Sequence, residues 1–379
     1  MRSYLTTLTA LLIGSWSIAQ EIIHNQYRFE VLAELPCTDV KDQAKTGTCW
    51  SFSTNSLIES ELMRQGLEVV DLSEMFYVRH IFLDKARKYV RYHGKTNFSD
   101  GSLSHDVLFG LREFGAVPEA VYGGRPKGEK EHDHQALNRE LKEYLDTTIA
   151  KRTIPSDWEA GFTAILDRHL GTLPDSFEYA GNSYTPHSFA DSWIRVDHDA
   201  YINFTSFNHH PLYQSFILEI PDNYSNGSYF NVSLEELFEI TRAAVLEGYS
   251  VAWDCDVSEK GFSSRQGLAL VPDLPEQEPG AATPAMDPFV GPCPEKEITS
   301  EMRQNEFDTY SLTDDHLMHI VGFVKDQNGK EYFQVKNSWG KEAGRDGFLF
   351  ASKAYFLANT IAVTFHKDAV PEVIMSKLR

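Results

Sequence analysis

The chain has 379 residues, of which 42% are hydrophobic and 24% are charged, a composition typical of a globular protein long enough to bury a large core. Its formal net charge of −20 argues against nucleic acid or an anionic membrane as a partner, because both require a basic surface.

The N-terminal residues predict a signal peptide over residues 1–19. Arg2 is followed by an apolar run, and Ser17 and Ala19 occupy the positions that a signal peptidase reads. The alternatives are a frayed helix or a membrane anchor, but the run is short beside the roughly 20 apolar residues of a membrane span. We therefore expect an exported protein, periplasmic or extracellular if its source is bacterial, with no membrane contact in its mature form.

The next part of the chain is predicted to be mainly helical. Residues 43–66 read as a loop followed by a helix, with Thr46 and Thr48 as candidate N-caps and Gly66 as a stop signal. Residues 125–235 are polar and predict helices joined by irregular loops. Three further helices are indicated by apolar periodicity and by flanking serine, glycine or proline: residues 71–94, 104–119 and 233–248.

The C-terminal third is rich in β-type sequence. Two such runs flank Asn328-Gly329, which is a strong hairpin signal. Residues 271–296 are proline-rich and acidic and predict an extended loop. Further strands are predicted for three segments: YSVAWDCDV, DGFLFASKAYF and TIAVTFH. Helices early in the chain and strands late in it indicate the α+β class.

Cys49 lies where the first predicted helix begins. Unpaired amides and the helix dipole at that position stabilise negative charge and favour the nucleophilic thiolate. A nucleophilic thiolate needs a histidine as acid and base, and a third group to orient that histidine. The predicted hairpin offers both, because His316 begins its first strand, Asn337 ends its second, and an antiparallel pair brings those ends to the same side.

Three short segments resemble the motifs of papain-like cysteine peptidases in order and spacing, with Gln43 six positions before Cys49: DQAKTGTCWSFS, DDHLMHIVGF and VKNSWG. Longer segments resemble the bleomycin hydrolase and aminopeptidase C branch of that family, among them DGSLSHDVLFGLREFGAVPE and YSVAWDCDV. The resemblance spans most of the chain, although the middle part matches loosely.

The resemblance implies a two-lobed papain-like fold with the active site in the cleft between the lobes. The chain then divides into one peptidase domain over residues 20–379, and the lobe boundaries within it follow from the element pattern. These are a helical lobe at about 43–120, a mixed insertion at about 121–235 and a β-rich lobe at about 236–379.

The resemblance also implies the role of each motif residue. The Cys49 thiolate attacks the substrate carbonyl, His316 delivers the proton to the leaving amine, and Asn337 fixes the imidazole ring. The Gln43 side chain and the Cys49 backbone N–H bind the oxyanion, and Trp339 shields the contact between His316 and Asn337.

Gly101 and Ser102 match the segment that pairs with the substrate backbone, although Gly101 reads equally well as a plain turn glycine. His319 competes with His316, but it is expected to face the opposite side of the strand. The HxxH spacing of these histidines lacks a third metal ligand, so no metal and no cofactor are expected. Other histidines, including His209 and His210, read as surface residues.

Several alternatives stay open. Cys37, Cys255 and Cys293 allow at most one disulfide among them. Peptide or protein is the expected substrate, and branch membership favours an aminopeptidase. An endopeptidase, an acyl transferase or a catalytically silent peptide-binding protein are alternatives. Relatives of this branch form hexamers, but their assembly surfaces lie largely in inserted parts, so an oligomer is left open.

The C-terminal sequence argues against the way in which enzymes of this branch recognise the substrate's amine. In those relatives the terminal carboxylate lies in the cleft and pairs with the substrate's amine. This chain ends KDAVPEVIMSKLR, and the positive charges of Lys377 and Arg379 oppose such a role.

Overall fold

The computed structural model describes residues 21–126, 128–274 and 287–378. The predicted signal peptide and part of the predicted loop at 271–296 lie outside these residues. The α-helices are α1 (Cys49–Arg64), α2 (Glu74–Arg91), α3 (Ser104–Phe114), α4 (Gln135–Ile149), α5 (Trp158–Leu170), α6 (Pro186–Phe189), α7 (Leu234–Leu246), α8 (Ser300–Asp308), α9 (Lys353–Asn359) and α10 (Glu372–Met375). The strands are β1 (Glu21–His24), β2 (Tyr27–Glu34), β3 (Phe177–Tyr179), β4 (Asn182–Tyr184), β5 (Tyr201–Thr205), β6 (Ser215–Ile217), β7 (Ser228–Asn231), β8 (Val251–Cys255), β9 (Phe262–Ser263), β10 (Leu268–Ala269), β11 (His316–Lys325), β12 (Glu331–Lys336), β13 (Phe348–Ser352) and β14 (Thr360–His366).

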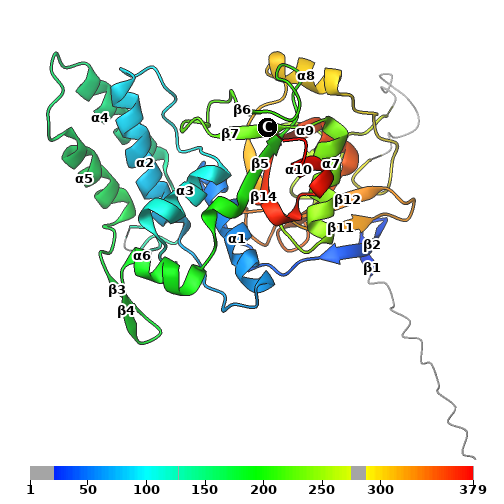
Figure 1. Ribbon diagram of the computed structural model, residues 1–379, viewed down its shortest axis with the longest axis horizontal. Helices are drawn as coiled ribbons and strands as arrows, with labels where there is room; N and C mark the ends of the chain where they lie inside the picture. Colours follow the sequence, from blue (N-terminus) through cyan, green and yellow to red (C-terminus); the bar gives the residue numbers. More distant parts are fainter. Residues whose placement is uncertain (1–20, 127, 275–286, 379) are drawn as a thin grey trace, which may run out of the picture.

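The chain forms a helical lobe and a β-rich lobe, with α1 between them (Figure 1). On one side α2 packs against α1, α3, α4 and α5, and on the other side α1 packs against β11 and β8. Because both sides of α1 are covered, even its polar residues are buried from Ser51 to Glu61. The α+β class and the two-lobed arrangement agree with the sequence prediction.

Local capping signals explain where several helices begin. Ser73 accepts a hydrogen bond from the Phe76 N–H at 3.1 Å, so it caps α2 as its sequence position predicts. Ser233 caps α7 and forms a reciprocal capping box with Glu236. Thr48 is the N-cap residue of α1, but its side chain makes no capping bond.

The β-rich lobe is built on a 12-stranded sheet in which β11 pairs with β8, β12 and β2. The predicted hairpin is β11–β12, and Gly329 in its turn has a φ of +80°, which glycine adopts readily. Along β11 the side chains alternate, so Leu317 faces the core of the helical lobe while Met318 faces the core under α7.

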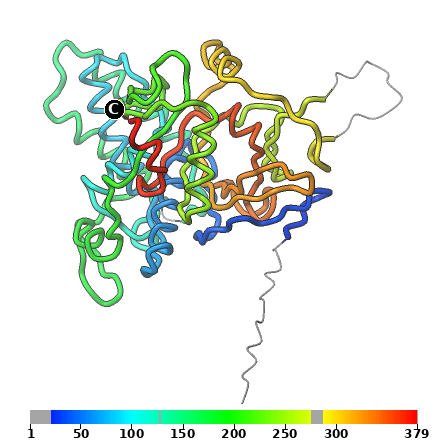
Figure 2. Tube along the Cα trace, turned by 45° about the vertical axis from the view of Figure 1, so that its right-hand side comes forward, coloured from blue at the N-terminus to red at the C-terminus, as the bar shows by residue number. Residues whose placement is uncertain are grey.

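Two regions differ from the sequence-based expectation. Residues 21–34, for which the sequence predicted no element, form β1 and β2, and β2 joins the main sheet beside β11. The DGFLFASKAYF segment is a strand only as far as Ser352, whose hydroxyl accepts from the Tyr355 N–H at 3.1 Å and starts α9. Figure 2 shows the middle segment divided between lobes: α4 and α5 lie with the other early helices, whereas β5 and β7 extend the sheet beyond β14.

The described part of the C-terminal tail packs against the β-rich lobe. Val370 and Ile374 lie in the same core as Phe238 of α7, and Lys377 Nζ lies 2.7 Å from Glu236 Oε1. Within residues 21–126, 128–274 and 287–378, no helix combines the length and apolar character needed to cross a bilayer.

Candidate active site

Cys49 is the first residue of α1 and faces the start of β11. Only 7% of the residue is exposed. Burial raises the pKa of the Cys49 thiol well above its usual range, while a backbone hydrogen bond from Leu317 opposes this shift. The thiol is therefore neutral in this state, which differs from the thiolate expected from its position at a helix N-terminus.

His316 and Asn337 meet at the ends of β11 and β12. His316 Nε2 lies 2.8 Å from Asn337 Oδ1, and the Ser338 N–H donates to the same oxygen at 2.7 Å. An atom that accepts from a backbone N–H is the amide oxygen, so His316 Nε2 carries the proton and Nδ1 is left as the basic nitrogen. The Trp339 ring stacks on the imidazole, with centroids 4.5 Å apart.

Burial also sets the charge of the imidazole. His316 is 3% exposed, and burial lowers the pKa of His316 to about 4, although the bond to Asn337 opposes this shift. With this lowered pKa the imidazole of His316 is uncharged at neutral pH, as is the thiol of Cys49.

Gln43 is held beside this pair by contacts across the two lobes. Its backbone N–H donates to Ser338 O at 2.9 Å, and Ser338 Oγ donates to its Oε1 at 2.6 Å. Its Nε2 donates to Thr46 O at 2.8 Å. An amide NH2 has two protons, so one remains to bind an oxyanion.

Gly101 and Ser102 lie between α2 and α3. Ser102 Oγ donates to Asp106 Oδ2 at 2.6 Å and the residue is 1% exposed, which argues against a substrate contact through its side chain. Above Gly101 lies the carboxylate of Asp222, from the loop between β6 and β7, a residue to which the sequence analysis gives no role. Asp100, which precedes Gly101, accepts from the Gly47 N–H at 2.7 Å and so ties this segment to the start of α1.

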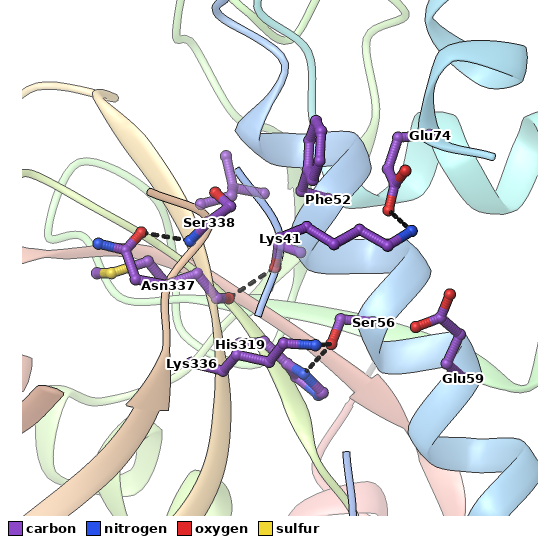
Figure 3. Close-up of a pocket in the computed structure, with 12 residues that line it drawn as sticks. Lys41, Phe52, Ser56, Glu59, Glu74, His319, Lys336, Asn337 and Ser338 are labelled. Carbon is purple, nitrogen blue, oxygen red and sulfur yellow. Dashed lines mark hydrogen bonds and ion pairs between the residues drawn. The ribbon is translucent and has the colours of Figure 1, made fainter. Parts of the chain in front are cut away.

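A cavity of about 20 Å³ lies behind Asn337, between α1 and the hairpin (Figure 3). Lys336 Nζ donates to Ser56 Oγ at 2.8 Å, and His319 Nδ1 lies 2.9 Å from the same hydroxyl. The volume is about that of a single water. These contacts fasten the residue preceding Asn337 to α1, and they occupy His319 away from His316.

The four cysteines all lie in the described residues and are free. Among those residues, one group of three side chains brings metal-ligating atoms within 4.8 Å of one another: His209, His210 and Glu219. Both histidines bond to Glu219, at 3.2 and 2.9 Å. This group lies on the loop around β6 and does not include any of the predicted active-site residues.

Comparisons with known proteins show which family this chain resembles. Residues 28–79 match the papain family cysteine protease profile, and residues 297–379 match that of the Peptidase C1-like family. Aminopeptidase C of Lactococcus lactis subsp. cremoris is 22% identical and covers 90% of this chain and 84% of its own length. Aminopeptidase W of Lactobacillus delbrueckii subsp. lactis is 23% identical, with 91% and 85% covered.

The comparison with named relatives also shows that the expectation of an exported enzyme is wrong. Cysteine proteinase 1 of Saccharomyces cerevisiae, 21% identical with 92% of this chain and 79% of the relative covered, is named as mitochondrial. The relatives thus contradict a periplasmic or extracellular location.

A solved structure shows the same fold. The crystal structure of PepW from Lactobacillus rhamnosis has a TM-score of 0.68 to this chain at 18% identity, and covers 92% of this chain and 84% of its own. The matched profiles, relatives and fold lead to one conclusion: the chain is a cysteine peptidase similar to papain-family enzymes and to aminopeptidase C.

Proposed function

We propose that this protein removes residues from the N-terminus of peptides through a covalent intermediate on Cys49, with His316 and Asn337 completing the catalytic triad. The observation that carries the proposal is the 2.8 Å contact between His316 Nε2 and Asn337 Oδ1. It fixes the tautomer in which Nδ1 is free to exchange a proton with a thiol. The named aminopeptidase relatives support the preference for N-terminal residues.

In the first half-reaction the Cys49 thiol gives its proton to His316 Nδ1 while the sulfur attacks the scissile carbonyl. The imidazolium then protonates the leaving amine, the C–N bond breaks, and a thioester remains. In the second half-reaction His316 takes a proton from water as the water attacks the thioester. The acid is released, and Cys49 regains its proton.

The oxyanion of each tetrahedral intermediate is stabilised by two donors, the free Gln43 Nε2 proton and the Cys49 backbone N–H. Ser338 holds the Gln43 amide by its oxygen at 2.6 Å, which orients the NH2 group in advance. A preorganised donor of this kind typically lowers the barrier by about 3 kcal/mol.

An endopeptidase of the same fold is the second candidate, and the position of the tail favours it. In the branch the chain's own C-terminus is expected to gate the cleft. Here Lys377 is paired with Glu236 on α7, and Val370 and Ile374 are buried in the core of the β-rich lobe. Gating by the tail would require this packing to open. An acyl transferase and a silent peptide-binding protein are further outcomes of the test, and the oligomeric state remains a separate question for light scattering.

The test is peptide hydrolysis combined with thiol labelling. We expect Cys49→Ala to abolish hydrolysis of a fluorogenic peptide without lowering the melting temperature. Iodoacetamide should label Cys49 in the wild type and much more slowly in His316→Ala. Cys37→Ala is the matched control, because Cys37 is also a free thiol but has no place in the triad.

Hydrolysis that persists in Cys49→Ala would overturn the nucleophile. Equal labelling rates with and without His316 would overturn the acid–base pair. A wild-type protein that binds peptides and cleaves none would identify a silent binding protein, and product masses separate hydrolysis from acyl transfer.

A further inference from the structure

Asp222 lies against Gly101, in the segment that the proposed function places beside the substrate. It belongs to the loop between β6 and β7, and its carboxylate lies so close to Gly101 that a Cβ added at Gly101 would overlap it. Gly101 is the residue expected to run beside the substrate backbone. The Asp222 side chain therefore fills the space directly beside Gly101, where a longer substrate would need room.

The Asp222 carboxylate is held in position by the helical lobe. Its Oδ1 accepts from Asn97 Nδ2 at 3.1 Å and from Ser99 Oγ at 3.2 Å. The same loop is fastened again by Tyr224, whose hydroxyl donates to Asp84 of α2 at 3.2 Å. Among the described residues no donor bonds to Oδ2, the oxygen over Gly101, so this atom can accept a bond from a ligand.

Two further carboxyls, those of Asp254 and Asp314, lie near Cys49 and contact each other. Asp254 is 2% exposed, and apart from this contact with Asp314 its oxygens have no hydrogen-bond partner. It pairs with Leu317 across β8 and β11, and the Leu317 backbone bonds to Cys49. Asp314 lies two residues before His316, and its Oδ2 is likewise buried without a partner.

A buried lysine lies beside this segment. Lys85 Nζ donates to the backbone oxygens of Ser99 and Gly101 rather than to a carboxylate. Burial and mutual repulsion raise the pKa of Asp254 and of Asp314. These two carboxyls therefore hold protons near neutral pH, and a cation bound beside them would favour their ionised form.

We infer that Asp222 is the group that receives the N-terminal ammonium of the substrate. This inference rests on the proposed function. A carboxylate at a fixed depth pairs with an ammonium and rejects a chain that continues beyond it. In this protein an internal loop thus provides the exopeptidase specificity, while the described C-terminal tail is packed on the β-rich lobe. The α-ammonium of a terminal residue fits this position better than a basic side chain does, because Asp222 supplies the negative charge and also blocks a substrate chain that continues beyond it.

The test compares three fluorogenic substrates: a single amino-acid amide with a free amine, its N-acetylated form, and an N-acetylated dipeptide amide with arginine in the N-terminal position. The wild type should strongly prefer the free amine. In Asp222→Asn, which keeps the shape and removes the charge, KM for the free amine should rise so that kcat/KM falls about 10- to 100-fold. Asp222→Ala should in addition gain cleavage of the acetylated substrates.

Tyr224→Phe is the matched control, since it removes the bond to Asp84 and leaves every charge in place. Its preference for the free amine should equal that of the wild type, and melting temperatures of all variants identify any that fail to fold. Asp222→Glu provides a second variant, because it retains the charge and should retain more of the preference for the free amine than Asp222→Asn.

The outcomes separate this inference from the proposed function. A wild-type preference for the free amine that is unchanged in Asp222→Asn overturns the inference alone. Equal Cys49-dependent cleavage of the free and acetylated amides by the wild type overturns both the inference and the N-terminal preference of the proposed function. Efficient, Asp222-dependent cleavage of the acetylated arginine substrate would mean that Asp222 binds a cationic side chain and not the α-ammonium. That result also overturns the inference. Absence of both peptide cleavage and Cys49 labelling overturns the proposed function itself.

Discussion

Removal of the Asn337 side chain tests the central contact of the candidate site. Asn337 Oδ1 accepts two hydrogen bonds, from His316 Nε2 at 2.8 Å and from the Ser338 N–H at 2.7 Å. In Asn337→Ala both donors lose their acceptor. Both donors are buried, since His316 is 3% exposed and Ser338 is 7% exposed. Water has little access to replace the lost oxygen.

The magnitude follows from these two orphaned donors. Each buried donor left unsatisfied costs about 1–3 kcal/mol, so we expect the free energy of unfolding to fall by about 2–4 kcal/mol, allowing for partial relaxation. The imidazole keeps its stack on Trp339 but loses the restraint on its ring rotation. A rise of about 1–3 kcal/mol in the barrier corresponds to a roughly 5- to 150-fold loss of kcat/KM.

Two measurements check this prediction. Urea unfolding gives the stability change, which does not depend on the proposed function. Steady-state hydrolysis of a fluorogenic peptide gives the catalytic change, which is expected mainly in kcat. The control is Asn337→Asp, which keeps acceptors in place and adds a negative charge beside Nε2. That charge should raise the pKa of His316 from about 4 and move the pH–rate profile to higher pH.

The reasoning would be refuted by an Asn337→Ala variant with wild-type stability and wild-type kcat/KM. Such a result would mean that His316 is oriented by its packing against Trp339 alone. An unchanged pH profile in Asn337→Asp would argue against contact between the two side chains during catalysis.

Two further predictions concern stability. Ser233→Ala removes the capping box of α7 and should lower the free energy of unfolding by about 1 kcal/mol, measured in urea; a change below a few tenths would show that packing alone sets the start of α7. Asp254→Asn should stabilise the protein more at pH 8 than at pH 5. Burial and Asp314 raise the folded-state pKa of Asp254. The stability that the wild-type carboxyl contributes is therefore present at low pH and is lost as the pH rises through that raised pKa. Thermal unfolding at both pH values is the assay, and a gain that is equal at pH 5 and pH 8 would show that Asp254 does not titrate in this range.

Local chemistry determined the elements that the sequence predicted well. Serine caps at positions 73 and 233, and the Asn328-Gly329 turn, act through contacts within a few residues, so they can be read without knowledge of the fold. The closeness of His316 and Asn337 also follows from sequence, because a hairpin brings the ends of its two strands together. In contrast, the capping serine at position 352 was missed because the flanking residues read equally well as strand.

The tertiary structure decided what depends on burial and on contacts between distant segments. The helix N-terminus predicted a thiolate at Cys49, but the packing of α1 between two lobes removes water from the thiol and favours its neutral form. Asp222 lies over Gly101 although 121 positions separate them (222 − 101), and no local pattern near either residue signals the other. Periodicity and capping act over a few residues, whereas desolvation and cross-lobe contacts exist only once the whole chain has packed.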